Sequence, residues 1–285
     1  MSGTRRRLAV LGSPIAHSKS PALHAAAYGV LGLDWTYTAV ETPEEELEPV
    51  VASTHWHGLS LTMPLKHAIR PLLEDEDPVA RATGAVNTVL FERREGGPPL
   101  LHGFNTDVAG IVRALGEAGI ASADRVEVLG GGATAASAIA AAAGLGASRV
   151  TVTLRAPERA AALAPVAAAL GVALDVRPFS AWGEGEPHRL VVSTLPGGAA
   201  EGLRVPDAVA GSSTLFDVAY SPWPSALARR WHGAGSLVVS GFGMLLHQAL
   251  VQVRVFVSGD PQVPLEREEA VLEAMREAVP DGGAR

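Results

Sequence analysis

The chain has 285 residues, which is enough for one large domain or two ordinary ones. Hydrophobic residues make up 47% and charged residues 19%, a balance that predicts a packed globular protein and excludes extended disorder. The net charge of −7 argues against nucleic acid as the main partner. The absence of cysteine excludes disulfides and thiol chemistry, and no stretch approaches the ~20 apolar residues of a membrane span. We therefore expect a cytoplasmic protein with no membrane partner.

Short apolar runs alternate with helical patterns in the first hundred residues. The run 8–12 ends in a glycine, which is typical of a buried strand followed by a turn. A helical pattern over 21–31 is closed by Gly32. Beyond it we expect strands at 35–40, 58–62, 86–92 and 100–104, the last two as a hairpin, and an acidic helix at 43–51.

A repeating strand–helix pattern follows a helix predicted over 107–118. Because strands alternate with helices, the pattern predicts a parallel sheet with helices on both faces. The expected strands are 125–129, 149–154, 190–194, 213–218 and 237–240, the helices between them 134–143 and 157–170, and the last elements are helices 244–257 and 266–279 and a frayed tail 281–285. We place the domain boundaries where the repeat begins and ends, so that residues 1–107 and 242–285 form one domain and 108–241 the other.

Two alternate serines, Ser18 and Ser20, follow the first strand. Residues i and i+2 of an extended segment face the same way, so the two hydroxyls would lie together and suit a carboxylate. Ser20 also stands where the N-cap of the following helix is expected. Ser60 and Thr62 repeat the same spacing at the end of the third strand.

Lys66 and Asp107 are the candidates for proton transfer. A close lysine–aspartate pair in a closed cleft tunes the pKa of both groups, as a general acid or base requires. The alternatives are a solvated lysine and an aspartate that only begins a helix, and the sequence leaves these open. The nine histidines form no metal-ligating pattern, so no metal is expected.

A run of three glycines, Gly130, Gly131 and Gly132, lies between a predicted strand and a predicted helix. Such a turn points backbone N–H groups and the positive end of a helix at one spot, which suits a pyrophosphate. Ala135 occupies the third glycine position of the dinucleotide-binding pattern. An ordinary tight turn without a ligand is the alternative interpretation.

The next strand ends at Arg155, and Arg159 lies about one turn into the following helix. An NAD site would place an acidic residue there, to accept a hydrogen bond from the ribose hydroxyl. A guanidinium instead suits the 2′-phosphate of NADP. The alternative is that both arginines are ordinary surface residues. We predict NADP rather than NAD.

Six motifs in chain order resemble those of the shikimate dehydrogenase family, and the resemblance covers nearly the whole chain. They are residues 12–24, 60–66, 85–88, 105–107, 217–222 and 241–248. The resemblance implies reversible NADPH-dependent reduction of 3-dehydroshikimate to shikimate, a step of aromatic amino acid biosynthesis. It also implies an α/β substrate domain, a Rossmann-like NADP domain, C-terminal helices that return to the first domain, and a cleft that closes on the substrate.

The resemblance further assigns roles to individual residues. Lys66 and Asp107 would handle the proton at the carbonyl that receives hydride. The substrate contacts would be Ser18, Ser20, Ser60, Thr62, Asn87, Asn105, Tyr220 and Gln248. The cofactor contacts would be Gly130, Gly131, Gly132, Ala133, Thr134, Arg155, Arg159, Thr194, Ala219 and Gly241. A small-molecule substrate is the expected partner, with the chain as a monomer or homodimer.

The chain departs from the family pattern at several positions. Ser60 and Ala25 replace asparagines of the substrate motifs, and Leu154 replaces an asparagine before Arg155. The glycine loop has Ala133 and Ala136 where the family often has glycine and a basic residue. The substrate side is therefore better supported than the cofactor side.

Two alternatives remain open. An NAD-dependent quinate/shikimate dehydrogenase is the nearest, although the serine pair and Arg155 favour shikimate and NADP. A non-catalytic sensor of shikimate-like ligands belongs to another class, and the presence of both Lys66 and Asp107 argues against it.

Overall fold

The computed structural model describes residues 5–52 and 56–280 of the chain. These residues form two compact units. The first unit comprises 5–52, 56–107 and 246–280, and the second comprises 108–245. The tail expected at 281–285 lies outside the described residues. Among the described helices, none is both long and apolar enough to cross a membrane.

The sheet of the first unit is mixed, with the strand order β2-β1-β3-β5-β6-β4. Strands β1 and β3 are parallel, whereas β5 runs antiparallel to both β3 and β6. The predicted hairpin is therefore confirmed, and the direct connection of β5 to β6 through residues 93–99 makes this pair antiparallel. The strands are β1 (Arg6–Gly12), β2 (Trp35–Glu41), β3 (Trp56–Leu61), β4 (Asp75–Glu76), β5 (Thr88–Glu92) and β6 (Leu100–Phe104).

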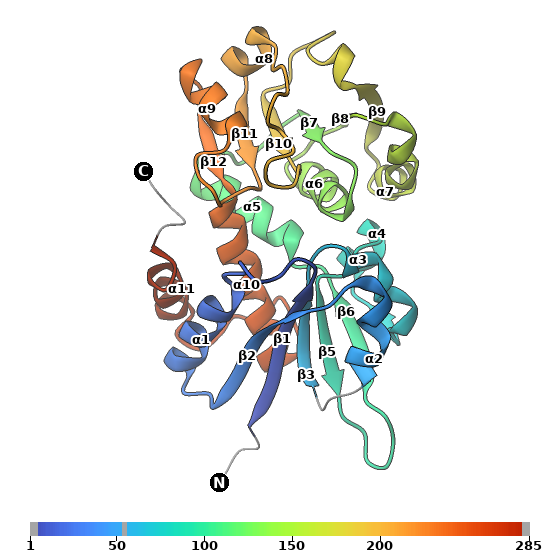
Figure 1. Cartoon of the computed structure of the whole chain (residues 1–285), viewed down its shortest axis with the longest axis vertical. Coiled ribbons are helices and arrows are strands. Elements are labelled where there is room, and N and C mark those ends of the chain that lie inside the picture. The colour runs from blue at the N-terminus through green and yellow to red at the C-terminus, as the bar shows by residue number, and fades with distance from the viewer. Residues whose placement is uncertain (1–4, 53–55, 281–285) are drawn as a thin grey trace. The chain divides into compact units, whose positions relative to one another are not determined.

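Helices cover both faces of this sheet (Figure 1). Apolar residues of α2, α3 and α4 pack on one face, where they share a core with Leu59, Val89 and other strand residues. On the other face, α10 comes so close that a side chain on Gly58 would overlap Phe256. The helices are α1 (Ser20–Leu31), α2 (Leu47–Ala52), α3 (Leu65–Ala68), α4 (Pro78–Thr83), α10 (Gly241–Ser258) and α11 (Glu268–Glu277).

The acidic segment predicted as one helix is in fact two short pieces. A 3₁₀ turn, Glu44–Glu46, precedes α2. The structure thus shortens the α-helix to six residues, and Leu47 and Val51 are the buried positions that anchor it.

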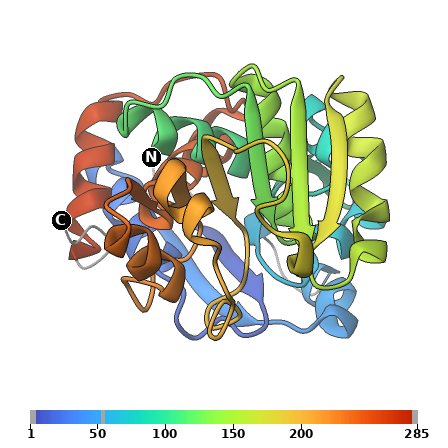
Figure 2. The ribbon, with the colours of Figure 1, turned by 90° about the horizontal axis from the view of Figure 1, so that it is seen from above.

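All six strands of the second unit are parallel, in the order β12-β11-β10-β7-β8-β9. Figure 2 shows β7, β8 and β9 side by side, coloured green to yellow. The order reverses between β7 and β10, and ligands of open α/β sheets bind at such a switch point. The strands are β7 (Arg125–Leu129), β8 (Arg149–Leu154), β9 (Ala173–Pro178), β10 (Leu190–Ser193), β11 (Thr214–Asp217) and β12 (Val238–Ser240).

The predicted α/β architecture is confirmed, with differences in detail. The helix expected over 157–170 is a 3₁₀ segment, Pro157–Leu163, followed by α7, because Pro165 stands in the first turn of α7 and favours a new helix start. Strand β9 was not predicted, since Asp175 and Arg177 interrupt its apolar pattern at the sheet edge. The helices are α5 (Asp107–Glu117), α6 (Ala133–Gly144), α7 (Ala164–Ala169), α8 (Asp207–Ser212) and α9 (Ala226–Gly233).

Candidate active site

Four chain segments meet where the central strands of the first unit's sheet end, and we call this end of the sheet the ion-pair edge. The strands β1, β3 and β6 end there, and β5 begins there, because β5 runs antiparallel to its neighbours. Backbone hydrogen bonds join the segments: Thr62 N–H donates to Leu11 (2.9 Å), Leu61 N–H to Asn87 (2.8 Å) and Asn87 N–H to Phe104 (3.0 Å). Motifs that are far apart in the sequence therefore converge at this edge.

Lys66 and Asp107 form a buried ion pair at this edge. The Nζ atom of Lys66 lies 2.5 Å from Oδ2 of Asp107, and the two side chains are only 12% and 5% exposed. Lys66 stands on the short helix after β3, and Asp107 is the first residue of α5. The other carboxylate oxygen of Asp107 accepts from Nδ2 of Asn87 at 2.7 Å. The sequence could not show that the two residues meet, and the structure brings them into contact.

Asn87 and Asn105 hold the loop that carries Asp107. The side chain of Asn87 accepts from Thr106 N–H (2.9 Å) and donates to the Thr106 hydroxyl (2.9 Å). The side chain of Asn105 accepts from Asp107 N–H at 3.0 Å and donates to the Thr83 hydroxyl at 2.9 Å. Both asparagines are buried, and their amides fix the backbone N–H groups of Thr106 and Asp107.

The serine pair adopts a different geometry from the one expected. Lys19 has helical dihedral angles (φ −87°, ψ −10°), so the segment is not extended at this point. Ser20 is the first residue of α1 and does not cap it; instead the Ser18 hydroxyl accepts from the Ser20 N–H at 3.3 Å. Ser18 is half-buried and Ser20 is buried, both beside the end of β1.

Ser60 and Thr62 face different surroundings at the end of β3. Ser60 is 3% exposed, and its hydroxyl accepts from the Tyr37 hydroxyl (2.7 Å) and donates to Oε1 of Gln252 (3.0 Å). Thr62 is half-buried. Gln248 is buried on α10, one turn before Gln252. Gln252 was not predicted from the sequence, although its spacing of four residues from Gln248 places both on one face of the helix.

The glycine run forms the turn between β7 and α6 in the second unit. Gly130 has φ +112°, and a Cβ atom there would lie 2.6 Å from the Thr194 hydroxyl oxygen, so the position requires glycine. Thr194 stands just after β10 and donates its hydroxyl hydrogen to the Leu129 carbonyl at 2.8 Å. The turn therefore lies at the switch point of the sheet.

The first turn of α6 fits an anionic group. Gly132 is the N-cap and has no side chain to bond the first helical N–H groups. Gly132 is exposed, and a Cβ atom there would meet nothing within 4 Å, so another molecule can approach the backbone closely. Ala133 and Thr134 follow in the first turn of the helix. The N–H groups and the helix dipole together suit a pyrophosphate.

The remaining residues predicted for the cofactor also belong to the second unit. Arg155 and Arg159 are exposed after β8, and the Arg155 guanidinium donates to the Ala199 carbonyl at 3.1 Å. Gly241 N–H donates to the Ala219 carbonyl at 3.3 Å, and a side chain on Gly241 would overlap the Val218 backbone. This close approach explains the glycine at 241.

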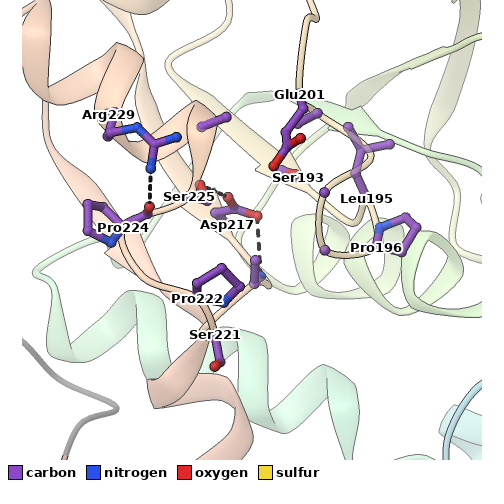
Figure 3. A pocket seen from close by; sticks show the side chains of 15 residues that line it. Ser193, Leu195, Pro196, Glu201, Asp217, Ser221, Pro222, Pro224, Ser225 and Arg229 are labelled. Carbon is purple, nitrogen blue, oxygen red and sulfur yellow. Dashed lines mark hydrogen bonds between the residues drawn. The ribbon is translucent and has the colours of Figure 1, made fainter. Parts of the chain in front are cut away.

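A small hollow of about 70 Å³ lies at the ends of β10 and β11 (Figure 3). Asp217 is buried there and accepts from the Ser225 hydroxyl (2.6 Å) and from the Ala219 N–H (3.2 Å). Burial raises the pKa of Asp217 and also that of Tyr220, which is half-buried in the same segment. Asp217 thus fixes the segment that carries Ala219 and Tyr220.

Over the part of the chain that the structure describes, no group of three or more acidic or histidine side chains could hold a metal ion.

Comparison with known proteins places this geometry in a family. Residues 10–89 match the family described as the shikimate dehydrogenase substrate binding domain. A protein of Rubrobacter xylanophilus named shikimate dehydrogenase (NADP(+)) is 35% identical, over 92% of this chain and 94% of that protein. The chain belongs to the shikimate dehydrogenase family.

Solved shikimate dehydrogenase structures resemble the whole chain. The crystal structure of the Mycobacterium tuberculosis shikimate dehydrogenase is 38% identical with a TM-score of 0.80, covering 95% of this chain and 99% of that one. The shikimate 5-dehydrogenase of Thermus thermophilus is 33% identical with a TM-score of 0.78, covering 96% and 99%, and its crystal structure is a complex with NADP(H) and shikimate. The resemblance drawn from the sequence motifs is thus confirmed.

Proposed function

We propose that this protein catalyses the reversible NADPH-dependent reduction of 3-dehydroshikimate to shikimate. The buried ion pair of Lys66 and Asp107 carries the proposal, because it places a proton donor among hydroxyl and amide groups at a sheet edge. Relatives over nearly the whole chain are named NADP(+)-dependent shikimate dehydrogenases, and the Thermus thermophilus structure contains both ligands.

The ammonium group of Lys66 acts on the carbonyl oxygen of the substrate. NADPH supplies hydride when bound, and hydride addition to a carbonyl carbon builds negative charge on its oxygen. The Lys66 ammonium stabilises that charge and donates the proton that completes the hydroxyl group. Asp107 holds the ammonium in place, and Asn87 occupies the second oxygen of Asp107, so the carboxylate keeps one orientation.

The substrate carboxylate and ring hydroxyls need several hydrogen-bonding groups. We assign them to Ser18, Ser20, Thr62, Tyr220 and Gln248. Ser18 and Thr62 are half-buried next to the ends of β1 and β3, which supports a position at the rim of the site. Asn87 and Asn105 act instead by holding Thr106 and Asp107, because their amides are bonded within the protein.

The second unit holds the cofactor in this proposal. The glycine turn and the first turn of α6 (Gly130, Gly131, Gly132, Ala133 and Thr134) would bind the pyrophosphate. Arg155 and Arg159 would bind the 2′-phosphate, since guanidinium groups pair with phosphate through two parallel donors. Thr194, Ala219 and Gly241 would line the rest of the site, at the ends of the neighbouring strands.

An absorbance assay at the nicotinamide band tests the proposal. Shikimate and quinate are each combined with NADP and NAD, and we expect the highest kcat/KM with shikimate and NADP. Arg155→Ala should lower kcat/KM with NADP roughly 10- to 100-fold and leave that with NAD unchanged, as expected for the loss of charge-assisted hydrogen bonds. Arg149→Ala is the matched control, because Arg149 is an exposed arginine at the other end of the same strand.

The same assay, together with thermal unfolding in the presence of shikimate, separates the alternatives. A higher kcat/KM with quinate and NAD would favour the NAD-dependent quinate/shikimate dehydrogenase. Shikimate that raises the melting temperature of the protein without any turnover would favour the ligand sensor, because ligand binding stabilises the folded state.

A further inference from the structure

A second set of buried polar side chains lies behind the ion pair, and the proton transfer does not use it. Its members come from α1, β2, β3 and α10, and we call it the Gln252 network. It consists of His24, Tyr28, Tyr37, Ser60 and Gln252. All five side chains are buried, so each polar group needs a partner within the protein.

The hydrogen-bond donors of the network point toward the side-chain oxygen of Gln252. The Tyr37 hydroxyl donates to Ser60 (2.7 Å), and the Ser60 hydroxyl donates to Oε1 of Gln252 (3.0 Å). Nε2 of His24 lies 3.2 Å from the same oxygen and donates to it, because an amide oxygen can only accept. Nδ1 of the neutral ring then accepts from the hydroxyl of Tyr28 at 3.1 Å. Two donors therefore meet at Oε1 of Gln252, and the orientation of its amide is fixed because Nε2 faces the backbone carbonyl of Asn87, which can only accept.

The other end of the Gln252 amide reaches the active-site edge. Nε2 of Gln252 donates to the backbone carbonyl of Asn87 at 3.4 Å, and the same carbonyl accepts from Leu61 N–H at 2.8 Å. The Asn87 side chain in turn holds Asp107. A continuous chain of contacts thus runs from Ser60 through Gln252 and Asn87 to the carboxylate of the ion pair.

We propose that Ser60 and Gln252 are positioning residues that fix Asn87, and through it the Asp107 carboxylate. Ser60 then acts through Gln252 and not by contact with the substrate. This assignment rests on the proposed function. Ser60 fits the role because its hydroxyl both accepts and donates within the network and is almost inaccessible to solvent.

Kinetic measurements on three variants test the assignment. Gln252→Met removes the contact to Asn87, and Ser60→Ala removes the hydroxyl that holds Gln252. We expect kcat to fall about tenfold in each, since small misplacement of catalytic groups lowers turnover. The KM for shikimate should stay within about threefold of the original value, because the substrate contacts remain. Ser60→Thr keeps the hydroxyl and should restore most of kcat.

Tyr28→Phe is the matched control. It also removes one buried hydroxyl from the network, but from a residue that contacts neither Gln252 nor Asn87 through the bonds of this network and reaches them only through His24. We expect a lower melting temperature with kcat within about twofold, as for a purely structural contact. The proposal is overturned if Ser60→Ala and Gln252→Met also keep kcat within twofold. It is equally overturned if Ser60→Ala raises the KM for shikimate while kcat is unchanged, because that pattern indicates direct contact.

A second measurement does not depend on turnover. The side-chain amide of Asn87 gives two NMR signals, which Asn87→Asp identifies by their loss. Gln252→Met should shift or broaden these signals, and Tyr28→Phe should leave them in place; unchanged signals in Gln252→Met would refute the positioning role. If the unmodified protein does not oxidise shikimate, the proposed function fails, and the NMR comparison still decides whether Gln252 positions Asn87.

Discussion

The ion-pair edge of the first unit is formed by side chains, whereas the glycine turn of the second unit is formed by backbone. At the edge, the side chains of Asn87 and Asp107 are buried, that of Lys66 is half-buried, and Asp107 is bonded to both of the others. At the turn, the groups proposed to bind a ligand are backbone N–H groups, and the absence of a side chain at Gly130 and Gly132 is what leaves room for the turn and for the proposed ligand.

The difference shows how each site is made specific. A site made of side chains is sensitive to the chemistry of each group, because every member is a partner of another. A site made of backbone is sensitive to added volume and to strained dihedral angles. Substitutions should therefore fail for different reasons in the two units, and three experiments examine this.

The largest effect is expected at the ion pair. Lys66→Ala removes the ammonium that stabilises the developing charge, so kcat should fall roughly 10²–10⁴-fold, the range typical of general acid catalysis. The KM for shikimate should change far less, because the ammonium acts mainly on the transition state. Steady-state assays with shikimate and NADP measure both values. Near-normal kcat in this variant would refute the catalytic role of Lys66.

The next largest effect is a pH dependence of stability due to His24 of the Gln252 network. The ring of His24 stacks on Tyr37, with ring centroids 3.8 Å apart. Burial lowers the pKa of His24 from 6.5 to about 3, although the hydrogen bond to Gln252 acts in the opposite direction. The folded protein therefore keeps His24 neutral, while the unfolded chain takes up a proton below pH 6.5. The stability conferred by this histidine is complete above pH 6.5 and is lost as the pH falls toward about 3.

The free energy of unfolding should fall by ~1.4 kcal/mol for each unit of pH decrease within that window. Urea unfolding of the protein and of His24→Asn, compared at several pH values, measures it, because the slope due to His24 is absent from the variant. The glycine turn contains no titratable side chain, so it makes no pH-dependent contribution to the free energy of unfolding. Equal slopes for the two proteins, or a His24 ring signal that titrates near pH 6.5 in the folded state, would show that the ring is not held neutral.

The smallest effect is expected at the turn, where two alanine substitutions separate strain from ligand approach. Gly130→Ala should lower the free energy of unfolding by about 1–3 kcal/mol, because alanine is strained at positive φ and would contact Thr194. Gly132→Ala should leave stability nearly unchanged, since the space beside it is open. It should nevertheless raise the KM for NADPH, because the added methyl group faces the proposed pyrophosphate. Equal effects on stability would contradict the contrast between the two glycines.

Several features of the fold followed from local patterns. Apolar runs that end in glycine predicted β1 and β7, and Gly32 predicted the end of α1, where it adopts a left-handed conformation. Strand β9 escaped prediction because its charged residues lie at the sheet edge, where burial does not demand an apolar run. The extended backbone expected between Ser18 and Ser20 was wrong for another reason. Helix α1 begins at Ser20, one residue earlier than its pattern indicated, and Lys19 already has helical dihedral angles.

The sequence by itself determined the α/β class, the family and the residue types available for catalysis, because hydrophobic periodicity and ordered motifs are local properties of the chain. Only the tertiary structure decided that Lys66 contacts Asp107 and that Ser60 bonds to Gln252. These contacts join residues 41 and 192 positions apart. They depend on the register of β3 with β5 and on where α10 crosses the sheet, which are set by packing of the whole unit and not by any single segment.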